Sequence, residues 1–379
     1  MTTDITPATL FSDLHLSEAM QHTLKKIGFK EASPIQKEAI PLLMAGFDIL
    51  GQAETGTGKT AAFAIPLIEQ AKPKTRHTQI LVLCPTRELA FQVAKAFDQL
   101  LSHLPKLRAT ALVGGESMTK QIRFYRRNPA IVVGTPGRVL DMLRQEVISF
   151  HQTKQVVLDE ADEMLDMGFR KDIEAILNTL PKKRQSILMS ATMSAPIKEL
   201  AQKYLHNPTL VKTAQDNASS KNVHQHYVPT DPGNRRRLLN QLVNEQQLHR
   251  GIIFCNTKRQ VDKVSGLLEK DGLNVSGLHG GMSQGQRNRV MKKFRSGKTS
   301  FLVATDVAAR GIDVKDIEVV FNYDFPQSNE SYVHRIGRTG RAQREGMAFT
   351  FVTRREQRFI KKLEKHTNSK IARTTIAAG

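Results

Sequence analysis

The chain has 379 residues, enough for two domains of ordinary size that each bury a core of their own. Lysine and arginine number 56 against 36 aspartates and glutamates, and residues 211–379 carry most of the excess, with 30 cations against 15 anions. This charge predicts a polyanionic partner, which is either nucleic acid or an anionic membrane surface. A membrane is the poorer alternative, because no apolar run approaches the ~18–20 residues that span a bilayer and no export signal is apparent.

Apolar runs of strand length alternate with amphipathic stretches throughout, which is the pattern of βαβ units in a parallel sheet. In the first half they predict strands at 47–51, 80–84, 109–113, 130–134, 155–159 and 186–190. In the second half they predict strands near 223–228, 251–255, 274–278, 300–304, 317–322 and 347–352. We therefore predict an α/β protein with one domain over residues 1–210, a polar linker over 211–222 and a second domain over 223–379.

The segment Ala53-Glu54-Thr55-Gly56-Thr57-Gly58-Lys59-Thr60 lies between a predicted strand and a predicted helix, as a phosphate loop requires. Glycines let backbone N–H groups approach phosphate oxygens, and the positive end of the following helix adds to that attraction. In this pattern Lys59 reaches the β- and γ-phosphates, and the Thr60 hydroxyl binds Mg²⁺. Ala53 stands where the first glycine is usual, so the alternative for this segment alone is a plain Gly-rich turn.

An acidic segment, Asp159-Glu160-Ala161-Asp162, follows a buried-strand pattern that delivers its first residues to the carboxyl end of a strand. Acidic clusters are usually solvated helix starts. Together with a phosphate loop, however, Asp159 is predicted to hold Mg²⁺, partly through water. Glu160 is then predicted to be the base for the attacking water.

The two halves resemble each other at comparable positions. Residues 81–87 (LVLCPTR) are similar to 253–259 (IFCNTKR), and residues 131–135 (IVVGT) are similar to 301–305 (FLVAT). Only the first half has a phosphate loop, so the second domain is predicted to close over the nucleotide of the first. Cys84 and Cys255 each close an apolar run, which predicts buried thiols in a reducing, cytoplasmic compartment and no disulfide framework.

Several loops after predicted strands combine small residues with a basic group, which suits a phosphodiester backbone without reading its sequence. Each loop alone is an ordinary turn, but parallel strands would bring them to one edge of a sheet. In the first half these residues are Pro85, Thr86, Arg87, Gly114, Gly115, Thr135, Pro136 and Arg138. In the second half they are Gly280, Gln284, Arg287 and Thr305.

The segment from His334 to Arg341 is the most informative part of the second half. On a helix, Arg338 and Arg341 are three residues apart and point the same way. Two guanidiniums suit a γ-phosphate whose charge grows during transfer, and such fingers contribute roughly 10³–10⁵ in rate in other nucleotide hydrolases. The alternative is a basic surface helix or a stripe that contacts RNA.

This combination resembles the DEAD-box family of ATP-dependent RNA helicases, from about Phe11 to residue 355, with the motifs in the family's order. The resemblance implies two tandem RecA-like domains, each a mostly parallel sheet flanked by helices. It implies ATP and Mg²⁺ as cofactors. It further implies RNA duplexes that are recognised through 2′-OH and phosphate contacts and are separated locally. It identifies no protein partner.

The resemblance also assigns roles to single residues. Phe29 and Gln36 match the adenine-reading segment and Phe11 its upstream aromatic, so Gln36 is expected to hydrogen-bond the adenine edge. Ala53 is normal in the family. Further matches are Ser190 and Thr192 with Asp162, which couple hydrolysis to strand separation, Gly311 and Asp313 beside the nucleotide, and His334, Arg338 and Arg341 at its γ-phosphate.

Two rival functions use the same motifs. An ATP-gated RNA clamp or scaffold would differ from a helicase only in its turnover compared with its residence time on RNA. A DNA translocase of the same superfamily is disfavoured by the adenine-reading segment around Gln36, and ATPase stimulation by RNA and by DNA separates the two.

Overall fold

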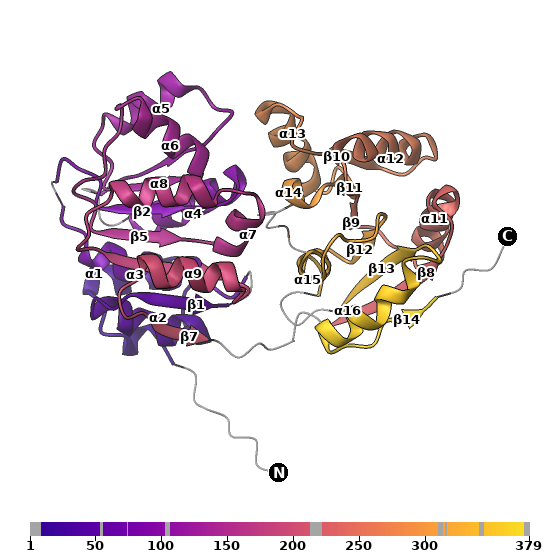
Figure 1. Cartoon of the computed structure of the whole chain (residues 1–379), viewed down its shortest axis with the longest axis horizontal. Coiled ribbons are helices and arrows are strands. Elements are labelled where there is room, and N and C mark those ends of the chain that lie inside the picture. Colours follow the sequence, from indigo (N-terminus) through magenta and orange to yellow (C-terminus); the bar gives the residue numbers. More distant parts are fainter. Residues whose placement is uncertain are drawn as a thin grey trace, which may run out of the picture. The chain divides into compact units, whose positions relative to one another are not determined.

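The computed structural model describes residues 9–53, 56–73, 75–102, 107–212, 222–309, 314, 317–340 and 345–374. The chain divides into two compact units, Met1–Gln215 and Asp216–Gly379. Each unit is a seven-stranded parallel sheet with helices on both faces (Figure 1). The predicted fold class is therefore confirmed. Among the described residues, no helix is both long and apolar enough to cross a membrane.

The sheet of the first unit has the strand order β3-β4-β2-β5-β6-β1-β7. Its strands are β1 (Ile49–Gln52), β2 (Ile80–Leu83), β3 (Ala109–Leu112), β4 (Ile131–Gly134), β5 (Gln155–Leu158), β6 (Gln185–Ser190) and β7 (Thr209–Lys212). All residues of the central strands β2, β4 and β5 are buried, because both faces are covered. This explains why these strands read as continuous apolar runs.

Two layers of helices cover this sheet. One core cluster packs one face against α1 (Glu18–Lys26), α2 (Pro34–Met44), α3 (Lys59–Gln70) and α4 (Arg87–Leu100). The other core cluster packs the opposite face against α5 (Met118–Tyr125), α6 (Pro136–Arg144), α7 (Ala161–Asp166), α8 (Arg170–Thr179) and α9 (Ala195–Tyr204). A short 3-10 helix, Phe11–Asp13, precedes α1.

The sheet of the second unit has the order β10-β11-β9-β12-β13-β8-β14. Its strands are β8 (Val223–Pro229), β9 (Gly251–Phe254), β10 (Val275–Leu278), β11 (Phe301–Ala304), β12 (Val319–Asn322), β13 (Gly346–Val352) and β14 (Ala372–Arg373). One face packs on α11 (Arg235–Glu245) and α12 (Lys258–Lys270). The other face packs on α13 (Gln284–Arg295), α14 (Asp306–Ala309), α15 (Asn329–Ile336) and α16 (Ile360–Thr367).

The two sheets have the same topology. When the strands of each unit are numbered from its first strand, both orders read 3-4-2-5-6-1-7. The sequence similarities fall on equivalent strands, because residues 81–87 and 253–259 continue from β2 and β9, and residues 131–135 and 301–305 contain β4 and β11. The sequence missed only the edge strands β7 and β14 among the strands that the structure describes.

Candidate nucleotide and RNA site

The phosphate loop connects β1 to α3, as predicted. Gly56 and Gly58 have φ angles of 87° and 90°, a left-handed conformation that other residues rarely adopt. Lys59 is the first residue of α3 and is buried, and its Nζ donates a hydrogen bond to the Ala53 carbonyl at 2.9 Å. The ammonium thus lies inside the curve of the loop, where a phosphate oxygen can replace that carbonyl. The predicted residues Glu54 and Thr55 lie outside the described residues.

The predicted adenine-reading segment is bonded to the phosphate loop. Gln36 is buried at the start of α2, where its Oε1 accepts from the Ser33 backbone N–H at 2.9 Å. Its Nε2 donates to the Gly58 carbonyl at 3.1 Å, and the Ser33 hydroxyl donates to the Thr57 carbonyl at 2.8 Å. An amide has two donor hydrogens and two acceptor lone pairs, so each side of the Gln36 amide keeps bonding capacity for a base.

The two predicted aromatic residues of this region contact each other. The rings of Phe11 and Phe29 lie edge to face, with centroids 5.6 Å apart. Phe11 is 3% exposed, whereas Phe29 is 37% exposed and has an open surface. Phe29 can therefore offer a ring to a bound base, and Phe11 supports it from below.

Asp159 follows β5 and is 2% exposed. Its Oδ1 is buried and has no hydrogen-bond partner among the described residues. Burial raises the pKa of this carboxyl to about 7, although the nearby Lys59 opposes the shift. An unsatisfied buried carboxylate is stabilised by a bound cation, so Asp159 fits the predicted Mg²⁺ role.

The remaining ligand set also fits Mg²⁺. Thr60 is half-buried in the first turn of α3, immediately after Lys59. No group of three or more His, Cys, Asp or Glu side chains in the described part of the chain could hold a metal ion. Magnesium commonly takes one or two protein ligands and completes its shell with phosphates and water, and Asp159 with Thr60 suits that mode.

Glu160 has an unusual backbone. Its φ and ψ are 50° and 54°, a left-handed conformation for a residue that is not glycine, and its side chain is buried. Such conformations cost on the order of 1–3 kcal/mol and concentrate at functional sites. The strained residue therefore lies in the short connection between β5 and α7, next to Asp159.

The acidic segment is joined to the predicted coupling segment. Asp162 Oδ2 accepts hydrogen bonds from the backbone N–H groups of Ala191 and Thr192, at 3.1 and 3.0 Å. The Ser190 hydroxyl donates to the Thr192 carbonyl at 2.7 Å. The Ala53 N–H donates to the Ser190 carbonyl at 3.1 Å. The acidic segment, the coupling segment and the start of the phosphate loop therefore share one cluster of hydrogen bonds.

The three predicted RNA-contacting loops of the first unit follow β2, β3 and β4, which are neighbours in the sheet. The Arg87 guanidinium lies against Gly114 and Gly115, where any larger residue would meet it. Arg138 Nη1 donates to the Glu116 carbonyl at 3.2 Å. The structure thus brings together the predicted residues of this edge, namely Pro85, Thr86, Arg87, Gly114, Gly115, Thr135, Pro136 and Arg138.

The predicted RNA-contacting residues of the second unit differ in exposure. Gly280 is exposed after β10, and Thr305 is half-buried after β11. Gln284 and Arg287 are only 7% and 8% exposed in the first turn of α13, so they present little surface. Nearby, His279 is hydrogen-bonded on both ring nitrogens, to the Asp262 carboxylate and to the Gly281 N–H.

The expectation that Arg338 lies on a helix is wrong. Helix α15 ends at Ile336, and Arg338 lies in the following turn, where its Nε donates to the His334 carbonyl at 3.3 Å. Arg341 lies outside the described residues, as do Gly311 and Asp313. Arg338 is instead one wall of a small pocket, which is lined by Phe254, Asp306, Ala309, Ser331, His334, Arg335 and Arg338.

Comparisons with known proteins agree with this geometry. The family model described as DEAD/DEAH box helicase matches residues 33–200, and the model described as helicase conserved C-terminal domain matches residues 234–343. The chain is 44% identical over 363 residues to the ATP-dependent RNA helicase CshA of Listeria monocytogenes, covering 96% of this chain and 70% of that protein. It belongs to the DEAD-box helicase family.

Further relatives support the same assignment. The DEAD-box ATP-dependent RNA helicase CshA of Bacillus subtilis is 43% identical over 363 residues, which are 96% of this chain and 73% of that protein. The solved structure of S. cerevisiae Dbp5 bound to RNA and ADP BeF3 has a TM-score of 0.88 at 31% identity, covering 97% and 96% of the two chains. Mss116p bound to single-stranded RNA and AMP-PNP has a TM-score of 0.88 at 26% identity, covering 100% and 82%.

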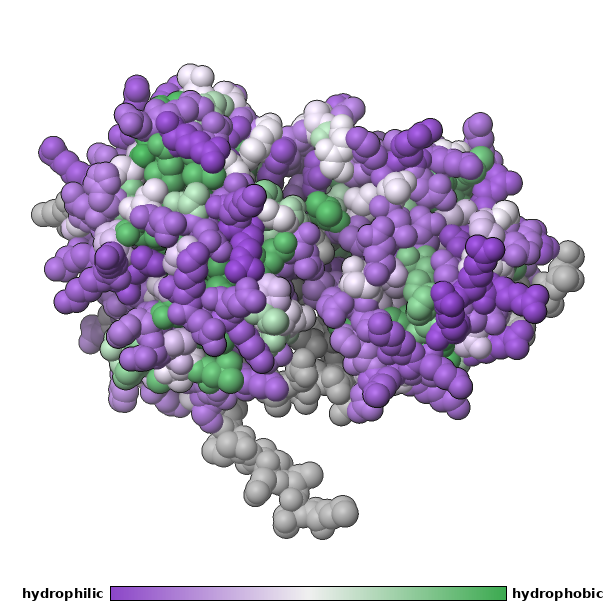
Figure 2. All heavy atoms as spheres, in the orientation of Figure 1, coloured by the Kyte–Doolittle hydropathy of each residue, from purple (hydrophilic) through white to green (hydrophobic). Residues whose placement is uncertain are grey.

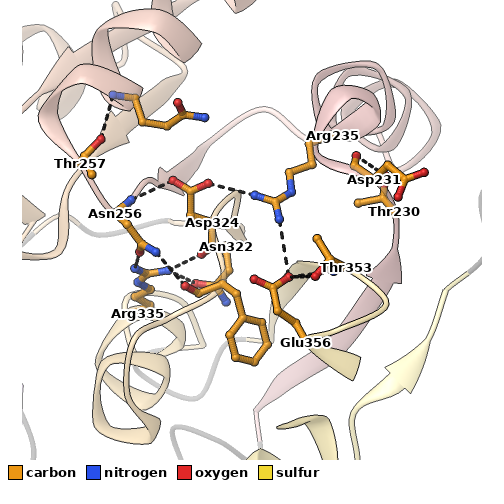
Figure 3. Close-up of polar contacts among 12 residues, drawn as sticks. Thr230, Asp231, Arg235, Asn256, Thr257, Asn322, Asp324, Arg335, Thr353 and Glu356 are labelled. Carbon is orange, nitrogen blue, oxygen red and sulfur yellow. Dashed lines mark hydrogen bonds and ion pairs between the residues drawn. The ribbon is translucent and has the colours of Figure 1, made fainter. Parts of the chain in front are cut away.

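One buried residue of this DEAD-box protein was missed by sequence reasoning. Arg335 is 1% exposed, and its guanidinium pairs with both carboxylate oxygens of Asp306 at 2.6 and 2.7 Å. It also donates to the Asn256 side chain at 2.7 Å and to the Asp324 carbonyl at 2.8 Å (Figure 3). Arg335 therefore connects α15, the helix that precedes Arg338, to Asp306, the residue that follows Thr305.

The network continues from Asp324. Its carboxylate accepts from Arg235 Nη1 and from the Asn256 N–H, both at 3.0 Å, and Arg235 Nη2 lies 3.6 Å from Glu356 (Figure 3). The signal for Arg335 was its spacing, because it lies three residues after Tyr332 on the buried side of α15. The partners Asn256 and Asp324 come from distant segments, and no local pattern identifies them.

Proposed function

We propose that this DEAD-box helicase binds ATP and Mg²⁺ at the phosphate loop of its first unit and uses hydrolysis to separate short RNA duplexes locally. The observation that carries the proposal is that Lys59, the unsatisfied carboxylate of Asp159 and the strained Glu160 lie at the carboxyl ends of β1 and β5, where Lys59 is near enough to act on the pKa of Asp159. A phosphate loop beside a buried carboxylate that has no hydrogen-bond partner is the arrangement expected of a nucleotide hydrolase.

The residues of the first unit divide the work of the reaction. Lys59 and the N–H groups around Gly58 bind the phosphates, and Gln36 and Phe29 bind adenine. Asp159 and Thr60 would hold Mg²⁺, which neutralises charge on the β- and γ-phosphate oxygens when bound. Glu160 orients the attacking water and accepts its proton.

The arginine segment of the second unit supplies cationic charge for the transferred phosphate. We assign this role to Arg338 and Arg341, with His334 supporting Arg338 through its carbonyl and Gly311 and Asp313 beside the nucleotide. The cluster of Asp162, Ser190 and Thr192 would respond to the state of the nucleotide and couple it to strand separation, because it joins the acidic segment to the coupling segment.

RNA would be held by its phosphates and 2′-OH groups along the loops after β2, β3 and β4 and at Gly280 and Thr305. The relatives Dbp5 and Mss116p were solved with RNA bound, which supports this polyanion over DNA. The cytoplasm is the proposed location, because Cys84 and Cys255 are buried free thiols whose pKa values are raised by burial.

The test is ATP hydrolysis by the wild type and by Glu160→Gln, without nucleic acid and with single-stranded RNA, duplex RNA or matched DNA. We expect RNA to stimulate the wild type and Glu160→Gln to lose about 10²–10⁴ in turnover while it still binds ATP. The control is Glu199→Gln, an exposed carboxylate paired with Arg170, which should behave as wild type. Equal stimulation by DNA would favour the translocase, and ATP-dependent RNA binding without wild-type turnover would favour the clamp.

A further inference from the structure

A strongly basic surface lies on and around α16 of the second unit, and none of its residues is among those assigned above. Between residues 353 and 374 the chain has eight lysines and arginines against two glutamates. All eight cations are exposed. We call this set the α16 basic surface, and it consists of Arg354, Arg355, Arg358, Lys361, Lys362, Lys365, Lys370 and Arg373.

The two glutamates of this segment do not neutralise the surface, because both are bonded inward. Glu356 Oε2 accepts from the N–H and hydroxyl of Thr353, at 2.8 and 2.7 Å, and lies 3.6 Å from the buried Arg235. Glu364 Oε1 accepts from the Ile371 N–H at 2.9 Å. The outer face therefore has cations without matching anions from its own segment, and the surface over α16 is mostly hydrophilic (Figure 2).

The fold gives this surface a fixed shape. On α16 the side chains of Ile360 and Leu363 are buried, whereas Lys361, Lys362 and Lys365 lie on the outer side. The buried side chains belong to the same core cluster as Tyr332 and Ile336 of α15. The lysines are thus carried on a helix that packs against the helix preceding Arg338.

An exposed aromatic ring lies within the basic surface. Phe359 is 40% exposed, and the Arg358 guanidinium lies 4.8 Å from its ring centroid. Its other contact is with Phe325, at 6.2 Å between centroids. Recognition of single-stranded nucleic acid combines two components. Cationic side chains bind its phosphate backbone, and aromatic rings stack on its bases.

The surface is separate from the predicted RNA-contacting residues of the same unit. Gly280 and Thr305 follow β10 and β11 at one side of the sheet, whereas the core under α16 involves β13 and β8. At least three strand spacings of about 4.8 Å separate these places, or roughly 15 Å. Helices α13, α15 and α16 cover the same face of the sheet, so one RNA strand can follow that face (Figure 1).

We propose that the α16 basic surface is a second RNA-binding site, which holds a single-stranded extension outside the strand engaged by the loops. This inference goes beyond the proposed function and rests on RNA being the substrate. The chemistry favours RNA over an acidic protein because Phe359 adds a stacking surface that unpaired bases use. Such a site holds the helicase beside a structured RNA while the loops release and rebind.

The experiment compares two double variants of the whole chain. In Lys361→Gln with Lys365→Gln, two exposed lysines are removed from one side of α16. In Lys263→Gln with Lys270→Gln, two exposed lysines seven residues apart are removed from α12, on the opposite face of the same sheet. Affinity for single-stranded RNAs of increasing length is measured over a series of salt concentrations, together with ATPase activity.

For long RNA we expect the α16 variant to weaken affinity about tenfold at about 0.1 M salt. The slope of log affinity against log salt should become about 1.4 less negative, because each lost contact to a single strand contributes about 0.7. Short RNA should bind and stimulate ATPase equally in both variants. Phe359→Leu should also weaken binding of long RNA, with the salt slope unchanged.

Equal slopes for the α16 and α12 variants would overturn this proposal, since the lysines would then act only through net charge. Unchanged binding of long RNA in the α16 variant would also overturn it and point to an acidic protein as the partner. The proposed function fails by a different result, namely wild-type ATPase that no RNA stimulates.

Discussion

The two units place a buried cation at the same point of the same topology and use it differently. In the first unit the loop after β1 leads into α3, whose first residue is Lys59, and in the second the loop after β8 leads into α11, whose first residue is Arg235. Lys59 bonds only a loop carbonyl among the partners described, beside an Asp159 oxygen that has no partner. Arg235 instead pairs with Asp324 at 3.0 Å and with Glu356 at 3.6 Å.

This difference explains why one unit needs a ligand and the other does not. Unsatisfied buried charge is costly, so under the proposed function the first unit would gain stability when phosphate and metal complete its site. In the second unit acidic side chains already supply the counter-charge that a nucleotide would bring. Buried pairs of this kind are weak sources of stability in themselves, but the loss of one partner is strongly destabilising.

The largest expected effect is therefore on the stability of the second unit. Asp324→Ala removes the counter-charge of buried Arg235 and an acceptor of the Asn256 N–H, and should cost about 3–5 kcal/mol. Hydrogen exchange resolved by peptide should show the loss in the second unit and leave the first unchanged. The control is Glu345→Ala, whose partner His224 is exposed, and which should change nothing measurable. An equal loss of stability in Asp324→Ala and Glu345→Ala would contradict the inference that the buried pair with Arg235 stabilises the second unit.

The next effect concerns nucleotide binding. Lys59→Gln should lower RNA-stimulated ATP hydrolysis by about 10²–10³, because it removes the cation proposed to bind the phosphates. Arg235→Gln should leave ATP affinity in the first unit unchanged while it destabilises the second unit. Affinity is measured with a fluorescent ATP analogue, alongside turnover. An equal loss of ATP affinity in both variants would contradict the assignment of nucleotide binding to Lys59 and of a structural role to Arg235.

Sequence patterns predicted the central strands and the motif residues better than the edge strands and the buried residues that hold the motifs in place. All twelve predicted strands are present, and the signal is strongest in the central strands, whose residues are apolar runs buried between two layers of helices. The missed edge strands lack this signal: in β7 only Val211 is buried, and both residues of β14 are exposed. The alignment of Arg338 by helical spacing failed because α15 ends before it. Arg335 and Asp324 were missed because their roles depend on contacts between distant segments.

A third prediction follows from the raised pKa of Asp159. Burial raises the pKa of this carboxyl from 3.8 to about 7, so the folded state binds a proton more tightly than the unfolded state. The stability due to the neutral carboxyl is present below about pH 4 and is lost as pH rises through about 7. Relative to Asp159→Asn, the wild type should lose about 2 kcal/mol between about pH 5 and 7 without nucleotide.

Denaturant unfolding of the first unit at a series of pH values tests this expectation. The neutral amide of Asp159→Asn has no proton to lose, so its stability sets the baseline. Adding ATP and Mg²⁺ should flatten the pH dependence of the wild type, because the cation favours the ionised carboxylate. A pH dependence shared by both proteins would assign the titration to other groups.

The smallest expected effect compares glycines in the RNA-contacting loops of the two units. Gly115 has a φ of 72°, and a Cβ there would collide with the Arg87 guanidinium, whereas a Cβ on Gly280 would meet nothing within 4 Å. A left-handed alanine alone costs about 1–2 kcal/mol, and displacing Arg87 would remove the phosphate contact proposed for it. Gly115→Ala should therefore weaken RNA binding about tenfold, which corresponds to about 1.4 kcal/mol, and Gly280→Ala should leave it unchanged. RNA titrations with an ATP analogue measure both. If only Gly280→Ala weakened RNA binding, the contact with the RNA backbone would lie at the Gly280 loop of the second unit. It would then not lie at the first-unit loop in which Arg87 packs against Gly115.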